Sequence, residues 1–229
     1  MATPITIGPQ EDGAVANAVS PAEEGASCPF SSSNGHLTQL MRRLFLEREI
    51  SLDRLPPEAL EDPSVTTIQA SKQEQGGRLY FWQLYSILGD DVVNELTEHF
   101  YTGIFSDEDD WFRKGFGRPN VKYHAVFLSM AFLDCFGGGK MYKGGEERLD
   151  DIHERTAGHS APHFLFTELG AKKWAGHMVV ALDKVQPQLD KIDIRARATI
   201  NEFLSFMMSR YAQQYDFDTA DVSFASKRA

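Results

Sequence analysis

Apolar side chains recur every three or four residues over most of the chain after residue 78, as they do on the buried face of an amphipathic helix. Asp90 and Asn120 are residue types that cap helix N-termini, whereas Gly89 and the run Gly137-Gly138-Gly139 are typical helix ends. No convincing pair of alternating segments indicates strands. The pattern predicts an all-α domain of about six helices, including 79–88, 90–104, 121–136, 172–185 and 193–214.

Two further expectations concern the middle of the chain. The helix that Asn120 caps has an apolar side that includes Tyr123, Phe127, Met130 and Phe132. The stretch from the glycine run to about Pro162 is polar, charged and rich in glycine, so we expect it to be mostly loop.

The segments outside this domain have a different composition. Residues 1–36 are rich in Ala, Gly, Pro and Ser and poor in large apolar side chains, which predicts a disordered N-terminal tail. Residues 37–78 predict a helical extension, stopped at Pro56-Pro57, and a linker. The domain is then expected over 79–216, with a C-terminal tail over 217–229.

Composition narrows the class of protein. Hydrophobic residues make up 42% and charged residues 24%, as in soluble globular proteins. The formal net charge of −10 argues against a nucleic-acid partner, and the longest apolar runs are too short to span a membrane. Cys28 and Cys135 form no disulfide framework, and the first residues resemble neither a signal nor a transit peptide, so we expect a cytoplasmic protein.

The histidines are the candidates for chemistry. Three of them, His153, His159 and His163, fall within eleven residues, a spacing compatible with solvated loop residues or with a zinc site. His124 lies among apolar neighbours, where a core histidine is commoner than a ligand. The run 137–140 departs from a phosphate-binding loop, because position 134 is not glycine and Met141 replaces the required Ser or Thr.

The order of several aromatic and glycine landmarks resembles the truncated haemoglobins, and the later ones are similar to the second group of that family. These landmarks are 98–101, 111–116, Phe136-Gly137-Gly138, Tyr142, 163–166, 173–178 and 198–213. The resemblance covers 79–214, about three fifths of the chain. It implies a truncated two-over-two globin sandwich with an N-terminal extension and with haem b as the cofactor.

The resemblance also implies roles for single residues. His163 would be the proximal iron ligand, and His159 is the alternative because the intervals on both sides of His163 differ from those of the family. Tyr101 and Trp174 match the two side chains that donate hydrogen bonds to the gas ligand. Phe116, Phe127 and Phe166 would contact the haem, with Lys140 and Tyr142 as propionate partners where Pro162 replaces the arginine of many relatives.

A count without gaps from the glycine run places His124 and Leu128 at the two distal positions of the helix over the haem. Their spacing of four residues puts both on one helix face. His124 has two alternative tasks, donation to the gas ligand or coordination of the sixth position of iron. Coordination is favoured because Tyr101 and Trp174 already supply donors.

The function implied is reversible binding of dioxygen, nitric oxide or other diatomic gases. Several donors around the ligand suit redox chemistry on nitric oxide or peroxide, supported by an unidentified reductase, better than oxygen transport. The alternatives are a gas sensor whose N-terminal extension docks a partner and a haem-free helical interaction protein. A homodimer is compatible with each of these functions.

Overall fold

The computed structural model describes residues 35–70, 76–159 and 165–226, and these residues form helices and turns without strands. The all-α class predicted from the sequence is confirmed. The α-helices are α1 (His36–Ser51), α2 (Pro63–Thr66), α3 (Tyr85–Phe105), α4 (Asp110–Gly115), α5 (Val121–Cys135), α6 (Gly145–His159), α7 (Glu168–Ile192) and α8 (Ala196–Tyr215), and the 3-10 helices are η1 (Pro57–Leu60) and η2 (Phe81–Gln83).

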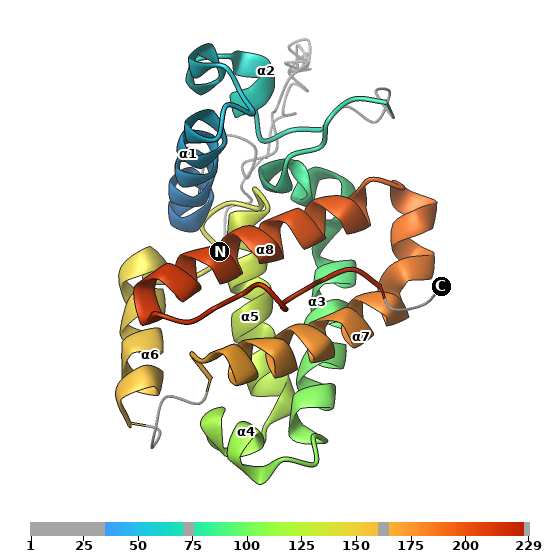
Figure 1. Cartoon of the computed structure of the whole chain (residues 1–229). Helices are drawn as coiled ribbons and strands as arrows, with labels where there is room; N and C mark the ends of the chain where they lie inside the picture. The colour runs from blue at the N-terminus through green and yellow to red at the C-terminus, as the bar shows by residue number, and fades with distance from the viewer. Residues whose placement is uncertain (1–34, 71–75, 160–164, 227–229) are drawn as a thin grey trace, which may run out of the picture.

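Four long helices form the body of the domain. Helix α3 packs against both α5 and α7, and α7 packs against α8. In Figure 1 the α7–α8 pair crosses in front of α3 and α5, which gives two helices over two. None of the described helices has the length and apolar character needed to cross a bilayer.

Helix α1 belongs to the same core as these four helices. The ring of Phe45 in α1 packs edge-on against Phe81 of η2 at 5.4 Å and against Phe206 of α8 at 5.5 Å between centroids. All three rings are fully buried. The helical part of the expected extension is therefore packed into the globular body, whereas residues 1–34 of the expected tail lie outside the described residues.

The N-terminus of α1 is capped by a residue far away in the sequence. Gly35 has no side chain to cap the helix, and a Cβ there would lie 1.5 Å from Oδ1 of Asp134, so only glycine fits. Asp134, at the end of α5, accepts hydrogen bonds at Oδ1 from the Thr38 hydroxyl (3.2 Å) and backbone N–H (3.4 Å). The Asp134 side chain is fully buried, and its Oδ2 has no partner among the described residues.

Several helix boundaries follow from the sequence. Gly89 breaks α3 with a φ of 67°, a conformation that residues with a Cβ rarely adopt. The Asn120 side chain accepts a hydrogen bond from the Tyr123 N–H and starts α5 as predicted. The predicted apolar side of α5 is wrong at Tyr123, which is 57% exposed because Ala125, Ser129 and Phe132 face the core instead.

Helix α6 corrects the expectation of a loop after the glycine run. It begins at Gly145, and Glu146 and Glu147 place negative charge in its first turn, where the helix dipole favours it. Leu149, Ile152 and His153 follow at spacings of three and four residues and all line one cavity. The short apolar stripe was masked by the charged residues between its members.

Candidate functional site

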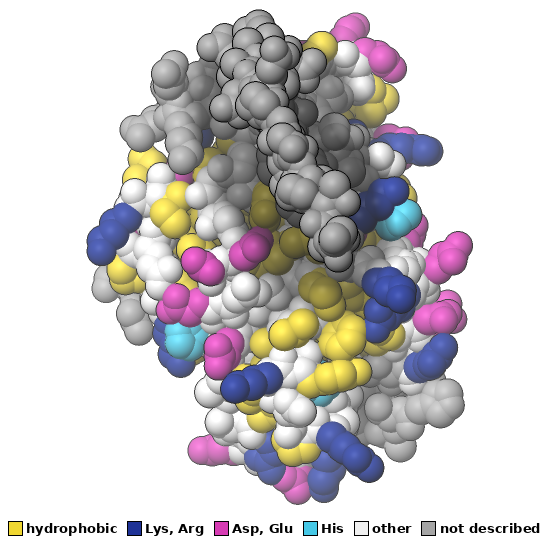
Figure 2. Space-filling view, turned by 180° about the vertical axis from the view of Figure 1, so that it is seen from behind, with side chains coloured by type: hydrophobic (Ala, Val, Ile, Leu, Met, Phe, Trp, Pro, Cys, Tyr) yellow, Lys and Arg dark blue, Asp and Glu magenta, His cyan; other side chains and the backbone are white. Residues whose placement is uncertain are grey.

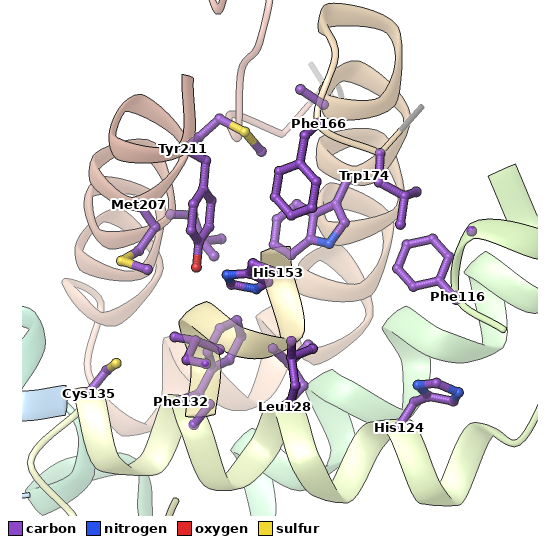
Figure 3. Close-up of a pocket in the computed structure, with 18 of the residues that line it drawn as sticks. Phe116, His124, Leu128, Phe132, Cys135, His153, Phe166, Trp174, Met207 and Tyr211 are labelled. Carbon is purple, nitrogen blue, oxygen red and sulfur yellow. The ribbon is translucent and has the colours of Figure 1, made fainter. Parts of the chain in front are cut away.

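A mainly apolar cavity of about 290 Å³ lies among α5, α6, α7 and α8. Its size falls near the lower end of that of small-molecule sites. Figure 3 shows the side chains that converge on it from these helices. The polar side chains among its lining residues are Tyr101, His124, His153, Trp174 and Tyr211. The cavity therefore combines a broad apolar wall with a small set of hydrogen-bonding and metal-binding groups.

Tyr101 reaches the cavity from α3. Burial, and to a lesser degree the neighbouring Tyr142, raise the pKa of its phenol, so the hydroxyl stays protonated at neutral pH. This hydroxyl has no hydrogen-bond partner among the described residues, and its ring lies 6.1 Å from that of Phe116. Tyr101 is therefore a free hydrogen-bond donor at the cavity wall.

Trp174 lines the cavity from α7 (Figure 3). Its indole packs edge-on against Phe100 of α3 at 4.9 Å and against Phe224, beyond α8, at 6.1 Å between centroids. No acceptor for its N–H is found within the described ranges. The two flanking rings hold the indole at the wall and leave its donor available.

His124 and Leu128 both line the cavity from α5. His124 lies between Tyr101 and Phe105, each at 5.2 Å between ring centroids. Its Nε2 is 3.2 Å from the carbonyl oxygen of Arg118 in the preceding loop. Since a carbonyl only accepts, Nε2 is the protonated nitrogen in this contact, and only Nδ1, the ring nitrogen nearer the main chain, is left to offer a lone pair to a metal.

His153 is the residue that sequence reasoning did not assign to the site. It enters the cavity from α6, 4.8 Å from Tyr211 and 5.5 Å from Phe166 between ring centroids (Figure 3). Its Nδ1 is buried without a partner in the described part of the chain. Desolvation by burial lowers the pKa of His153 to about 4, so the imidazole is neutral at physiological pH.

A neutral, unpartnered imidazole in an apolar cavity is a rare arrangement, because buried polar groups normally have hydrogen-bond partners. It offers a nitrogen lone pair, which is what a soft or borderline metal ion takes from histidine. The signal for it in the sequence is the position of His153 one residue after Ile152 and four after Leu149, on the apolar side of α6, where the composition predicts a loop.

The other predicted site residues fall into three sets. Phe116 and Phe166 line the cavity. Phe127, Lys140 and Tyr142 do not, and Phe127 and Tyr142 instead stack under the guanidinium of Arg148 at 4.9 and 5.3 Å. His163 and the side chain of His159 lie outside the described residues, so the proximal assignment stays a prediction from the sequence.

A charged cluster lies next to Trp174 along α7. Asp107, after α3, accepts hydrogen bonds from Lys173 (2.8 Å) and pairs with His177 (2.6 Å), both on α7. Desolvation would raise the pKa of Asp107, but hydrogen bonds from Lys173, the Asp109 backbone and His177 outweigh it and lower this pKa to about 2. The cluster therefore ties the end of α3 to the turn of α7 that carries Trp174.

The described residues thus form an all-helical, two-over-two body around an apolar cavity with histidine, tyrosine and tryptophan at its wall, an arrangement typical of globins. The family model of bacterial-like globins matches residues 83–209. The two-on-two hemoglobin-3 of Arabidopsis thaliana is 29% identical over 111 residues, which is 48% of this chain and 57% of that relative. No solved structure gives a significant match.

The chain belongs to the bacterial-like, or truncated, globin family, as the resemblance in the sequence indicated. Membership implies that it binds haem and that it binds small gas ligands through the haem. The match covers more than half of the chain, and it leaves out both α1 and the segment that follows α8.

Proposed function

We propose that this protein holds haem b in the cavity with His153 as the iron ligand, and that it binds dioxygen and nitric oxide there for redox chemistry. The observation that carries the proposal is the buried imidazole of His153, which is neutral and has no partner among the described residues. The sequence has no Cys-x-x-Cys-His motif for covalent attachment, which supports a haem of the b type.

The donor set fits such a cofactor. A bound haem would supply a redox-active ferrous iron with an open position for a diatomic gas. His153 would give its lone pair to the iron, since burial keeps its ring unprotonated. The wall of Leu128, Phe116 and Phe166 would exclude water from the faces of the macrocycle.

Tyr101 and Trp174 would act on the gas ligand itself. Both line the cavity, and neither the phenol hydroxyl nor the indole N–H has a partner among the described residues. A hydrogen bond to a group that carries charge contributes about 1.5–3 kcal/mol, so each donor would slow ligand escape by roughly ten- to a hundred-fold. Such retention favours reaction over transport, and it supports nitric oxide dioxygenase or peroxidase-like chemistry with electrons from an external reductase.

His163 is the competing proximal ligand, because Leu165 and Phe166, two and three residues further along the chain, line the same cavity. The experiment that separates the candidates is the visible absorption spectrum of purified holoprotein. We expect His153→Ala to lose haem or to change its spin state, and His163→Ala and His159→Ala to keep the wild-type spectrum.

A matched rescue sharpens this test. In His153→Gly, added imidazole should occupy the vacated space and restore the wild-type Soret band, because the apolar walls are intact. Loss of haem in His163→Ala, with a normal spectrum in His153→Ala, would overturn the assignment. A wild-type protein that takes up no haem would overturn the proposed function as a whole and would favour a haem-free interaction protein.

Gas sensing is the second candidate, and one contact favours it. Leu37, the second residue of α1, is fully buried and lines the cavity although α1 precedes the globin match. A change in the cavity could thus reach the N-terminal segment through α1. Multiple turnover of nitric oxide or peroxide with a reductase would support the enzyme, whereas stoichiometric gas binding without turnover would support the sensor.

A further inference from the structure

The segment after α8 forms a strap across the face of the globin body. Helix α8 ends at Tyr215, and Asp216 reverses the chain with a φ of 55°. Residues 216–226, which we call the C-terminal strap, then run back across α7 and α8, as the red trace in Figure 1 shows. The strap lies beyond residue 209, where the globin match ends.

The strap is fixed on α7 at two points, on either side of Trp174. Asp221 pairs with Lys172 at 2.9 Å, two residues before Trp174. The Ser226 hydroxyl donates to Asp183 at 3.2 Å, nine residues after Trp174. The strap therefore runs along the part of α7 that carries this tryptophan.

Two aromatic side chains of the strap contact the site directly. Phe217 lines the cavity. Phe224 is 3% exposed, and its ring packs edge-on against the Trp174 indole. Arg197 of α8 donates to the Phe224 carbonyl at 3.5 Å and pairs with Asp183 at 3.1 Å, so the backbone at Phe224 is anchored as well.

We propose that the C-terminal strap completes the gas-binding site and that Phe224 is a positioning residue for Trp174. The indole is held between two rings, Phe100 at 4.9 Å from within the globin body and Phe224 from the strap. Phe100 alone restrains one side. Removal of Phe224 opens space on the other side, into which the indole turns and withdraws its N–H from the ligand. This inference rests on the proposed function, since it requires a gas ligand in the cavity.

The test uses carbon monoxide bound to the ferrous holoprotein, with the C–O stretching frequency as a measure of hydrogen bonding to the ligand. Trp174→Phe defines the shift caused by complete loss of the indole donor. We expect Phe224→Ala to shift the frequency in the same direction. We expect the double variant to shift it no further than Trp174→Phe alone, because Phe224 acts only through Trp174.

Two further variants guard against a general loss of structure. Phe224→Leu keeps an apolar side chain and should fold if Phe224→Ala does not, and it should still give part of the shift because the flat ring is lost. Asp218→Ala is the matched control, since it removes an exposed strap side chain whose hydrogen bond, from the Ala220 N–H, is made within the strap, and it should leave the frequency unchanged.

The dioxygen dissociation rate provides a second measurement. It should rise about ten-fold in Trp174→Phe and by a smaller factor in Phe224→Ala. Shifts that add in the double variant, or an unchanged spectrum in both Phe224 variants while Trp174→Phe shifts it, would overturn the inference. Failure of the wild-type protein to bind haem would instead count against the proposed function, so the two failures are distinguishable.

Discussion

Replacement of Asp134 by asparagine is expected to stabilise this protein at neutral pH, although Asp134 caps α1. The carboxylate is fully buried, Oδ1 accepts from Thr38, and Oδ2 has no partner among the described residues. Desolvation raises the pKa of Asp134, and the opposing hydrogen bonds from Thr38 and Leu37 and the charge of His36 only partly offset it. The buried charge is therefore destabilising, because its desolvation costs more free energy than its hydrogen bonds and the charge of His36 regain.

The expected change in the free energy of unfolding follows from comparing the two oxygen atoms of the Asp134 carboxylate. Asparagine keeps an oxygen for Thr38 and replaces the unpartnered charged oxygen by a neutral amide. An unsatisfied buried group costs about 1–3 kcal/mol, and more when it is charged, so removal of the charge should gain about 1 kcal/mol. For a domain of this size, that corresponds to a rise in Tm of roughly 2–4 °C. Asp134→Ala removes the cap as well and should instead lower stability by about 1 kcal/mol or more.

The pH dependence gives the sharper test. A carboxyl whose folded pKa is raised contributes stability that is fully present below its unfolded pKa of about 3.9 and is lost as pH rises through the folded pKa. The advantage of Asp134→Asn over wild type should therefore be largest at pH 7 and should shrink as pH falls toward 4. Urea unfolding of both proteins at several pH values, in the same haem state, measures this difference. A less stable asparagine variant at pH 7, or an advantage independent of pH, would refute the reasoning.

Three other predictions concern the cavity and the N-terminal tail. Tyr101→Phe should raise the dioxygen dissociation rate about ten-fold, as measured by stopped flow, through loss of one charge-assisted hydrogen bond, whereas an unchanged rate would make Tyr101 a packing residue. Nε2 of His124 is engaged by the Arg118 carbonyl, so we expect His124 not to coordinate the haem iron. The absorption spectrum of the ferrous protein without gas should then be that of a five-coordinate, high-spin iron. A six-coordinate, low-spin spectrum that disappears in His124→Leu would contradict this. Deletion of residues 1–34 should leave the absorption spectrum and Tm nearly unchanged, and a large fall in Tm would show that they pack on the core.

Local signals in the sequence are sufficient to predict most of the long helices and two of the side chains that line the cavity. Stripes of large apolar residues indicated α3, α7 and α8, and Gly89 and Asn120 act where their backbone and capping chemistry predicts. Tyr101 and Trp174 were assigned by their order along the chain, and both line the cavity.

The parts that were missed depend on contacts between distant segments. Helix α6 has only Leu149 and Ile152 as large apolar residues on its inner face, so its pattern was too weak to distinguish it from a charged loop. Leu37 and Phe217 reach the cavity from segments on either side of the family match, and no periodicity in the sequence specifies that approach. The same applies to Asp134, which caps a helix 96 residues away.

The cap that Asp134 provides for α1 affects the order in which parts of the chain fold during synthesis. Helix α1 leaves the ribosome before α5, yet its first turn is completed by a side chain that is synthesised almost a hundred residues later. A helix of 16 residues is marginally stable alone in water, so α1 gains its lasting structure only after α5 has emerged and formed. Until then its apolar residues Met41 and Phe45 are exposed to solvent and to chaperones. Completion of α1 thus depends on translation of the middle of the chain.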